Sequence, residues 1–200
     1  MDKALALKKV KETMESDKTL PLIEKPEDVI PGDGNPNSKI MFIGEAGGYY
    51  ESIQRKPFVG AAGQLLTRLL NEIGLKRENV YISNMVKTRP PSNRDPFPEE
   101  LQAFGKYLDQ EIEIINPKVI VTLGRFSMGK FIPGSFISSI HGKPHKLNWK
   151  GKSIVVVPMY HPAAALRRGD VMQAIKEDFK KLPEILEEAT KPEITQMELV

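Results

Sequence analysis

The sequence predicts an α/β fold in three layers, with a central four-stranded parallel sheet between two layers of helices. The predicted strands are four apolar runs rich in β-branched residues, at 39–44, 80–86, 118–124 and 153–160. Helical patterns alternate with these runs, at 61–74, 98–115, 125–132 and 171–189. Strands that alternate with helices form parallel sheets, and strands buried on both faces are apolar at nearly every position. Both observations indicate a sheet that is covered by helices on each side.

The same pattern predicts how the chain is organised. A chain of 200 residues suits one domain, which we expect to span residues 1–190. It begins with a short amphipathic helix at 1–16. The segment 88–100 contains four prolines and is predicted to be a loop. Residues 191–200 are predicted to form a flexible tail.

The composition excludes several classes of protein. The sequence contains no cysteine, so it can form no disulfide, no thiolate zinc site and no cysteine-held iron–sulfur cluster. No apolar run approaches the roughly 18 residues of a membrane span, and the first residues lack a signal-type apolar core. We therefore expect a cytoplasmic protein that does not enter a membrane. Its net charge of +3 permits a polyanionic partner without requiring one.

Polar residues stand at the ends of the predicted strands. In chain order the strand-end residues are Gly44 and Glu45, Asn84, Gly124 and Arg125, and His161. Ligands of open α/β sheets bind beyond the carboxyl ends of the strands. The sequence therefore predicts a site at this edge, where a carboxylate, an amide and an imidazole come together.

The side chains at this edge favour attack by water on a planar group. Glu45 can position a water, and His161 can hold or donate a proton near neutral pH. Asn84 offers a donor beside an acceptor, the pattern that reads a nucleobase edge, and Phe58 can stack on a flat ring. Each residue alone also fits a structural role, such as a capping glutamate or a core phenylalanine. Their joint placement at strand ends is what favours a site.

Five segments carry a resemblance to a known family. They are "GDGNPNSKIMFIGEAGG", "KPFVGAAGQLLTRLLNEIGL", "VYISNMVKTRPPSNRDPFPEE", "INPKVIVTLGR" and "YHPAAALRR". Together they resemble the uracil-DNA glycosylase superfamily, and within it family 4, the thermostable type of bacteria and archaea. The resemblance implies an enzyme that flips uracil out of DNA and cuts its N-glycosidic bond, leaving an abasic site for base excision repair. We expect it to be monofunctional, because no lysine stands among the strand-end residues to form a Schiff base.

The resemblance also implies roles for individual residues. Glu45 and His161 would be catalytic, with Glu45 positioning the attacking water and His161 stabilising charge on the departing base. Glu51 would shape the pocket or share the water. The expected uracil-binding residues are Gly44, Ala46, Phe58 and Asn84. The expected DNA-binding residues are Arg89, Arg94, Arg125, Lys143, Ala164, Leu166, Arg167 and Arg168. The partner is then DNA containing uracil, bound by a monomer.

The sequence departs from the family pattern in three places. The family holds an iron–sulfur cluster on four cysteines, and the residues at their likely positions here are Asp17, Leu20, Thr88 and Phe104. We therefore expect neither cofactor nor metal, and apolar packing in place of the cluster. Where the family has a proline after "GEA", this sequence has Gly47, which predicts a looser loop. The usual acidic run is replaced by Tyr49–Tyr50–Glu51–Ser52.

Other functions stay open at this level. A glycosylase for another deaminated base, hypoxanthine or xanthine, would keep the same fold. A binding module for uracil-containing or damaged DNA could have lost turnover through the changes at Gly47, Tyr49 and Tyr50. An unrelated nucleotide-binding enzyme is disfavoured because the sequence has no phosphate loop or dinucleotide fingerprint. Irreversible uracil capture is not expected, since the histidine stretch of the covalently trapping relatives is missing, and His141 is expected to be a loop or phosphate-contacting residue.

Overall fold

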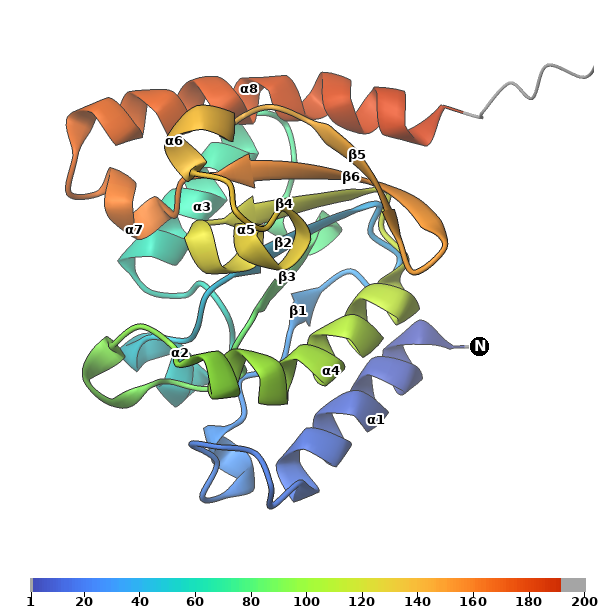
Figure 1. The fold of residues 1–200 in the computed structure, drawn as a ribbon, viewed down its shortest axis with the longest axis vertical. Helices are drawn as coiled ribbons and strands as arrows, with labels where there is room; N and C mark the ends of the chain where they lie inside the picture. Colours follow the sequence, from blue (N-terminus) through green and yellow to red (C-terminus); the bar gives the residue numbers. More distant parts are fainter. Residues whose placement is uncertain (1, 192–200) are drawn as a thin grey trace, which may run out of the picture.

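The computed structural model describes residues 2–191, and Figure 1 shows them as helices on both sides of one sheet. Within the described residues the sheet has six strands in the order β1-β3-β2-β4-β6-β5. In chain order the strands are β1 Asp33–Gly34, β2 Ile40–Gly44, β3 Tyr81–Asn84, β4 Val119–Leu123, β5 His145–Trp149 and β6 Lys152–Met159. The four predicted strands are confirmed as the parallel centre, β3-β2-β4-β6.

The described helices match the predicted ones and add three short ones. They are α1 Lys3–Ser16, α2 Tyr49–Gln54, α3 Ala61–Glu72, α4 Pro98–Ile115, α5 Arg125–Phe131, α6 Ile137–Ile140, α7 Pro162–Ala165 and α8 Gly169–Thr190. The predicted helix at 98–115 is confirmed to the residue, because Pro98 starts it and Asn116 ends it in a left-handed conformation. The predicted tail lies outside the described residues except for Lys191.

Two edge strands extend the predicted four-stranded sheet. β1 pairs antiparallel with β3 and β5 pairs antiparallel with β6, one at each edge. β1 has only two residues and so carries no pattern. β5 reads "HKLNW" and alternates between half-buried and exposed side chains, as an edge strand with one covered face does. A search for continuous apolar runs therefore misses both.

Both faces of the central strands are buried. On β2, Ile40 and Phe42 pack with α3 and α8, and Phe42 stacks on Phe179 of α8 with ring centroids 6.1 Å apart. The alternate residues Met41 and Ile43 pack on the other face with α4. Helix α1 lies outside α4, as Figure 1 shows. Two-sided burial explains why the strand has no polar position.

Apolar packing occupies the region to which the resemblance assigns a cluster. Leu20 and Phe104 are buried together with Val10 and Met14 of α1. Asp17 accepts hydrogen bonds from Lys106 Nζ at 2.9 Å and from the Tyr107 hydroxyl at 2.6 Å, and the Lys106 contact holds the pKa of Asp17 well below its usual range.

These residues do not fit an iron–sulfur cluster. Leucine and phenylalanine offer no ligand atom, and the sequence contains no thiolate to replace them. Among the described residues no cluster of histidine, aspartate and glutamate has the arrangement of a metal site. A separate finding concerns membranes: none of the described helices combines the length and apolarity that a transmembrane span needs.

Candidate active site

The parallel register brings the strand ends to one edge of the sheet. Gly44 at the end of β2 pairs with Asn84 at the end of β3, and Leu123 of β4 pairs with Met159 of β6. In Figure 1 the arrowheads of β4 and β6 point to the side of the sheet where α5 and α7 lie. His161 follows two residues after Met159. The predicted convergence of strand-end residues is therefore present.

Asn84 and Phe58 meet over Gly44. A Cβ atom on Gly44 would lie 2.5 Å from Asn84 Oδ1 and 2.5 Å from the Phe58 ring, so only glycine leaves room for both side chains. Asn84 is 2% exposed, and its Oδ1 accepts no hydrogen bond from any described residue. Buried polar atoms are nearly always paired, so an acceptor without a protein partner at a strand end points to a ligand. Among the described residues at the strand ends, this oxygen is the clearest sign of a binding site.

The position of Phe58 is fixed by contacts that the sequence did not reveal. Its backbone is left-handed, with φ of 53°, a conformation that costs free energy and persists only where neighbours hold it. Arg77 donates to Phe58 O at 2.8 Å and to Pro57 O at 2.6 Å. A Cβ on Gly63 would lie 1.9 Å from Phe58 O, so this glycine lets helix α3 approach. Arg77 lies in "KREN", which looks like an ordinary charged turn, and no signal in the sequence identifies it.

His161 is held as a neutral ring beside Phe58. The two ring centroids are 5.5 Å apart with an interplanar angle of 30°. Burial lowers the pKa of His161 to about 4, although Glu51 opposes this shift. The backbone N–H of Ala163 donates to His161 Nδ1 at 3.1 Å. An Nδ1 that accepts a hydrogen bond carries no proton, so the proton of the neutral ring is on Nε2, which is free to donate.

Glu45 lies on a loop that continues the pairing of β2 with β3. Met85 N donates to Gly44 O at 3.0 Å, and Val86 N donates to Glu45 O at 2.9 Å. Burial raises the pKa of Glu45 to about 7, with a further increase from Asp95 and a smaller opposing effect of Arg125. A carboxyl with this pKa is partly ionised near neutral pH and can accept a proton from water.

Two residues after Glu45, the loop is more firmly held than the sequence predicted. Gly47 is buried, and its N–H donates to Thr88 O at 3.1 Å. A Cβ on Gly47 would lie 2.2 Å from Ile30 Cδ1, so the backbone is packed closely here. Proline has no N–H and could not donate this hydrogen bond. Glycine at this position is thus compatible with a fixed loop.

Glu51 clamps the loops of the site together. Its Oε1 accepts from Val59 N at 2.8 Å and from Gly60 N at 2.7 Å, and its Oε2 accepts from Gly48 N at 3.2 Å. These bonds join the loop that carries Glu45 to the segment that carries Phe58. Both oxygens thus hold the two loops together, which is compatible with the expected role of Glu51 in shaping the pocket.

Comparison with known proteins agrees with this geometry. Residues 31–186 match the family model described as the uracil DNA glycosylase superfamily. A "Type-4 uracil-DNA glycosylase" of Sulfurisphaera tokodaii is 46% identical over 188 residues, covering 90% of this chain and 84% of the relative. Proteins of the same name from Archaeoglobus fulgidus and Thermotoga maritima are 48% and 44% identical, over 78% and 76% of this chain and 81% and 80% of theirs. This chain belongs to the uracil DNA glycosylase superfamily. Its similarity to these relatives places it in the type-4 family, with no cysteine to hold a cluster.

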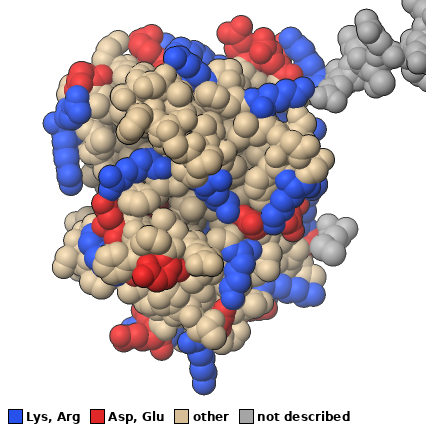
Figure 2. Space-filling model, in the orientation of Figure 1, with Lys and Arg blue, Asp and Glu red and all other residues tan. Residues whose placement is uncertain are grey.

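Most of the predicted DNA-binding residues lie around the same edge, and several are engaged with acids. Arg94 pairs with Glu100 at 2.6 Å. Arg125 pairs with Asp95, and Arg168 pairs with Asp170. Figure 2 shows blue and red side chains interspersed over this view of the surface rather than a field of one sign.

The loop after His161 presents an apolar tip and a free cation. Ala164 lies in α7 against the core, whereas Leu166 follows α7 and is 44% exposed. Arg167 is exposed, and its side chain has no hydrogen bond or ion pair with another described residue. Arg89 donates to Asn93 Oδ1 at 2.8 Å from the loop after β3. The geometry is compatible with the predicted wedge and phosphate contacts, which stay predictions.

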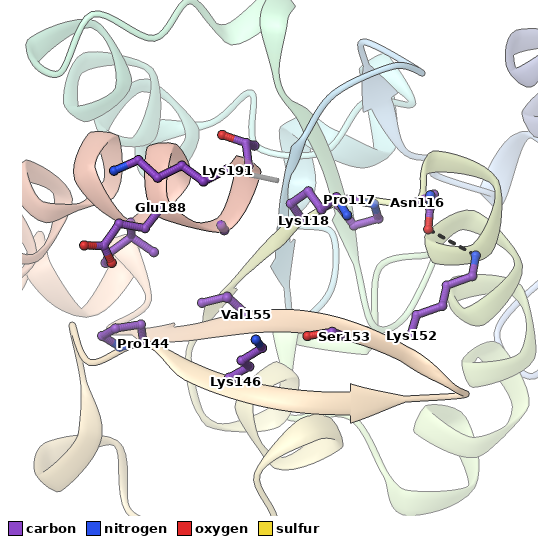
Figure 3. A pocket seen from close by; sticks show the side chains of 13 residues that line it. Asn116, Pro117, Lys118, Pro144, Lys146, Lys152, Ser153, Val155, Glu188 and Lys191 are labelled. Atoms are coloured by element: carbon purple, nitrogen blue, oxygen red, sulfur yellow. Dashed lines mark hydrogen bonds between the residues drawn. The ribbon is translucent and has the colours of Figure 1, made fainter. Parts of the chain in front are cut away.

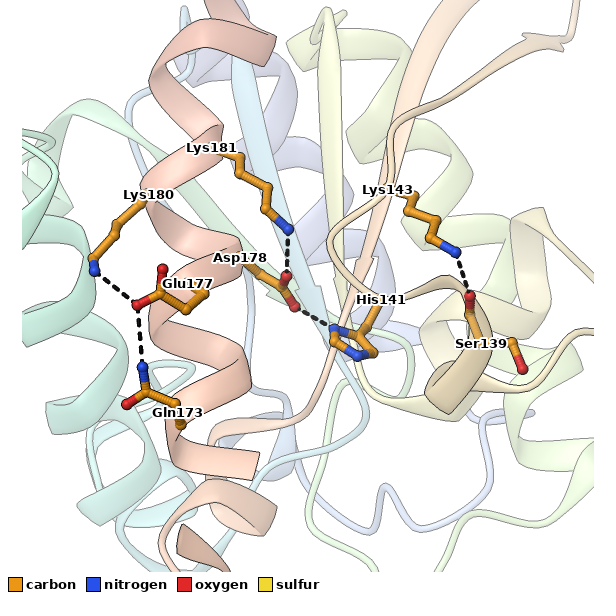
Figure 4. A network of polar contacts seen from close by, with 8 residues as sticks. All are labelled: Ser139, His141, Lys143, Gln173, Glu177, Asp178, Lys180 and Lys181. Atoms are coloured by element: carbon orange, nitrogen blue, oxygen red, sulfur yellow. Dashed lines mark hydrogen bonds and ion pairs between the residues drawn. The ribbon is translucent and has the colours of Figure 1, made fainter. Parts of the chain in front are cut away.

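His141 is held by an aspartate, as Figure 4 shows. Its Nδ1 lies 2.6 Å from Asp178 Oδ2, and Lys181 pairs with the other oxygen of Asp178 at 3.0 Å. The ring lies 4.7 Å from that of Tyr160. Lys143, in the same loop, donates to Ser139 O at 2.9 Å. These contacts give His141 a structural role in the loop, and phosphate contact by either residue stays a prediction.

A buried ion pair lies beneath the site and was not predicted. Lys87 is fully buried, and its Nζ contacts Glu111 Oε2 and Ser83 Oγ. Ser83 Oγ also donates to Glu111 Oε2 at 2.7 Å. Burial lowers the pKa of Lys87, and Glu111 opposes that shift. Because Lys87 follows Val86, whose N–H donates to Glu45 O, the pair fixes the segment that supports the loop with Glu45.

A lysine-lined groove lies at the far edge of the sheet. Its volume is about 740 Å³, and it is formed where β4 and β6 begin and α8 ends. Figure 3 labels Lys118, Lys146, Lys152 and Lys191 around it. None of the predicted site residues lines this groove. The candidate active site lies instead at the carboxyl ends of the parallel strands, around Asn84.

Proposed function

We propose that this protein is a uracil-DNA glycosylase that flips uracil out of DNA and hydrolyses its N-glycosidic bond, leaving an abasic site. The names of its relatives support this reading. The observation that carries it is the buried Asn84 amide, whose oxygen has no donor among the described residues and lies over Gly44 beside Phe58. A flat base with one N–H next to one carbonyl fits this arrangement.

Asn84 would select uracil through the order of its two polar atoms. Oδ1 accepts from uracil N3–H, while the amide nitrogen donates to O4. Cytosine presents an acceptor at N3 and a donor at position 4, which leaves both amide atoms unpaired. Such mispairing in a buried site is penalised by several orders of magnitude. Phe58 stacks on the base, and the backbone of Gly44 and Ala46 closes the pocket.

Glu45 and His161 would share the chemistry. The Glu45 carboxylate positions and deprotonates the water that attacks the sugar carbon as the base departs. Negative charge that develops on uracil is stabilised by a hydrogen bond from His161 Nε2, which is protonated because Nδ1 accepts from Ala163. A neutral donor serves better here than a titrating one, since its state does not change between pH 5 and 8.

DNA binding would combine base flipping with phosphate contacts. Extruding a base costs a few kcal/mol, and least where the base is mispaired or unpaired. Leu166 would fill the space that the base leaves, and Arg167 would bind the neighbouring phosphate. Neutralising phosphates releases counterions, so the affinity should fall steeply with salt.

We further propose that the protein works without cofactor or metal, as a cytoplasmic monomer. Residues 1–190 would form its one domain and residues 191–200 a tail. Glu51 would act by shaping the pocket, because its three backbone bonds occupy both oxygens.

The test is a gel assay with labelled oligonucleotides that contain uracil opposite guanine, opposite adenine or unpaired, followed by alkali to break abasic sites. Wild type is compared with Glu45→Gln, Asn84→Ala and His161→Ala, and with Glu72→Gln, an exposed change on α3, as the control. Multiple turnovers that are lost in the three site variants and kept in the control support the proposal.

Two outcomes would favour the other functions. Product that stops at one equivalent of protein, or tight binding without product, would indicate a binding module. Release of hypoxanthine or xanthine in place of uracil would indicate a glycosylase for another deaminated base. The first result would overturn the assignment as an enzyme, and the second would overturn the assignment of Asn84 as the reader of uracil.

A further inference from the structure

Helix α2 exposes an apolar surface that the active site does not use. Tyr49, Tyr50 and Ile53 are 54%, 59% and 62% exposed. They are three of the seven large apolar side chains that are markedly exposed among residues 2–191, and they lie within five positions of one another. Single exposed apolar residues are common, but several together mark a contact surface. We call these three residues, with Arg89, the aromatic patch.

The aromatic patch is fixed at the rim of the candidate active site. Helix α2 begins after Gly48, three residues beyond Glu45, and Glu51 of the same helix binds the backbone of Gly60. A Cβ on Gly60 would lie 3.5 Å from the Tyr50 ring, so Tyr50 packs beside the segment that carries Phe58. The patch is therefore tied to both loops that form the pocket, and a ligand in the pocket would continue onto it.

The chemistry of the patch suits unpaired bases. The rings of Tyr49 and Tyr50 meet edge to face, with centroids 5.4 Å apart and an interplanar angle of 77°. The guanidinium of Arg89 lies 5.2 Å from the centroid of the Tyr49 ring. Exposed aromatic faces next to arginine are how proteins bind single-stranded nucleic acid, because every base has a face to stack and every nucleotide a phosphate. In a duplex the neighbouring bases are stacked on each other and offer no free face.

We propose that the aromatic patch stacks on unpaired bases next to the flipped uracil and gives the protein a preference for single-stranded DNA. This inference rests on the proposed function, because the pocket sets where the strand lies. A peptide partner is disfavoured by the position of the patch, which adjoins the pocket, and by its arginine, which complements phosphate.

The test compares Tyr49→Ser/Tyr50→Ser with wild type on uracil in a single strand and in a duplex opposite guanine. Each lost stack should weaken single-strand binding by about tenfold, so we expect the single-strand KM to rise about 10- to 100-fold. The duplex KM and kcat should change less than about threefold. Tyr49→Phe/Tyr50→Phe keeps the rings and should retain wild-type values. Phe136→Ser is the matched control, since Phe136 is 77% exposed on the segment before α6.

A second readout separates this inference from the proposed function. The affinity for a single-stranded oligonucleotide without uracil is measured by fluorescence anisotropy, which needs no catalysis. A weaker affinity in the serine variant supports the aromatic patch even if wild type releases no uracil. Absence of uracil release would contradict only the proposed function. Equal losses on single strand and duplex, or unchanged single-strand KM and affinity, would overturn the inference. Unchanged values together with a tightly bound peptide would assign the patch to a protein partner.

Discussion

Replacing Glu45 by glutamine should make the folded protein more stable at pH 8, although it removes the proposed catalytic base. The pKa of this carboxyl is raised in the folded chain, mainly by burial. A raised pKa means that the folded state binds the proton more tightly than the unfolded state does. The contribution of Glu45 to stability therefore falls as the pH rises from the ordinary pKa of the group to its raised pKa in the folded chain, and it is most unfavourable above the raised pKa. Glutamine resembles the protonated acid and never ionises.

The magnitude follows from the pKa of about 7 in the folded chain and the ordinary value of 4.5. At about 1.36 kcal/mol per pH unit, the difference sets an upper limit of roughly 3.4 kcal/mol above pH 7. Glu45 is only partly buried, so solvent screening reduces this to roughly 1.5–3 kcal/mol. For a chain of this size the variant should melt about 3–12 °C higher at pH 8. At pH 5 no more than about a quarter of the effect should remain.

The assay is thermal unfolding of wild type and Glu45→Gln at pH 5 and pH 8 in the same salt, followed by circular dichroism. Glu72→Gln, an exposed change on α3, corrects for the loss of one surface charge. The reasoning is refuted if Glu45→Gln melts no higher than wild type at pH 8, or if its gain is the same at both pH values. Either result would mean that folding does not raise the pKa of Glu45.

Three further predictions concern the loop and its support. Asp95→Asn should lower the pKa of Glu45, because Asp95 raises it. The acid limb of the pH–rate profile, which reports ionisation of Glu45 under the proposed mechanism, should move to lower pH by about 0.2–0.7 units, since exposed charges interact by roughly 0.2–1 kcal/mol. A limb that moves to higher pH would contradict this. Lys87→Met should lower the free energy of unfolding, measured in urea, by about 3–5 kcal/mol, because it leaves the buried carboxylate of Glu111 without its ion-pair partner. Lys87→Met/Glu111→Leu should recover most of that loss, and a double variant as unstable as the single would argue against the pairing. Gly44→Ala should raise KM at least tenfold and should also lower the melting temperature, because its Cβ would lie 2.5 Å from the buried Phe58 ring. An unchanged KM would show that the ring moves aside.

The sequence predicted the parts of the fold that depend on local pattern. The four central strands were visible because each is buried on two faces and therefore apolar throughout. Both ends of helix α4 were predicted correctly, and its start is marked by a proline at the first helical position. Glu45, Asn84 and His161 could be placed together because parallel strands end at the same edge of a sheet.

The parts that escaped prediction depend on contacts between distant segments. Arg77 holds Phe58 from 19 positions away, and Lys87 meets Glu111 across 24 positions. In the sequence each looks like a charge in a polar turn, because nothing local shows which side chain will be buried. The bonds that Glu51 accepts from the backbone of Val59 and Gly60 also join separate segments, and no local pattern reveals them.

The amide oxygen of Asn84 has a consequence for turnover. No described residue donates to it, so no protein group competes with a ligand for this position. The N3–H of uracil that would bind there in the proposed complex is the same before and after the glycosidic bond breaks. The released base therefore keeps its hydrogen bonds and its stacking contact, and we expect free uracil to raise the apparent KM without lowering kcat. Under the proposed function, the contacts that make the pocket selective would therefore also slow the release of uracil.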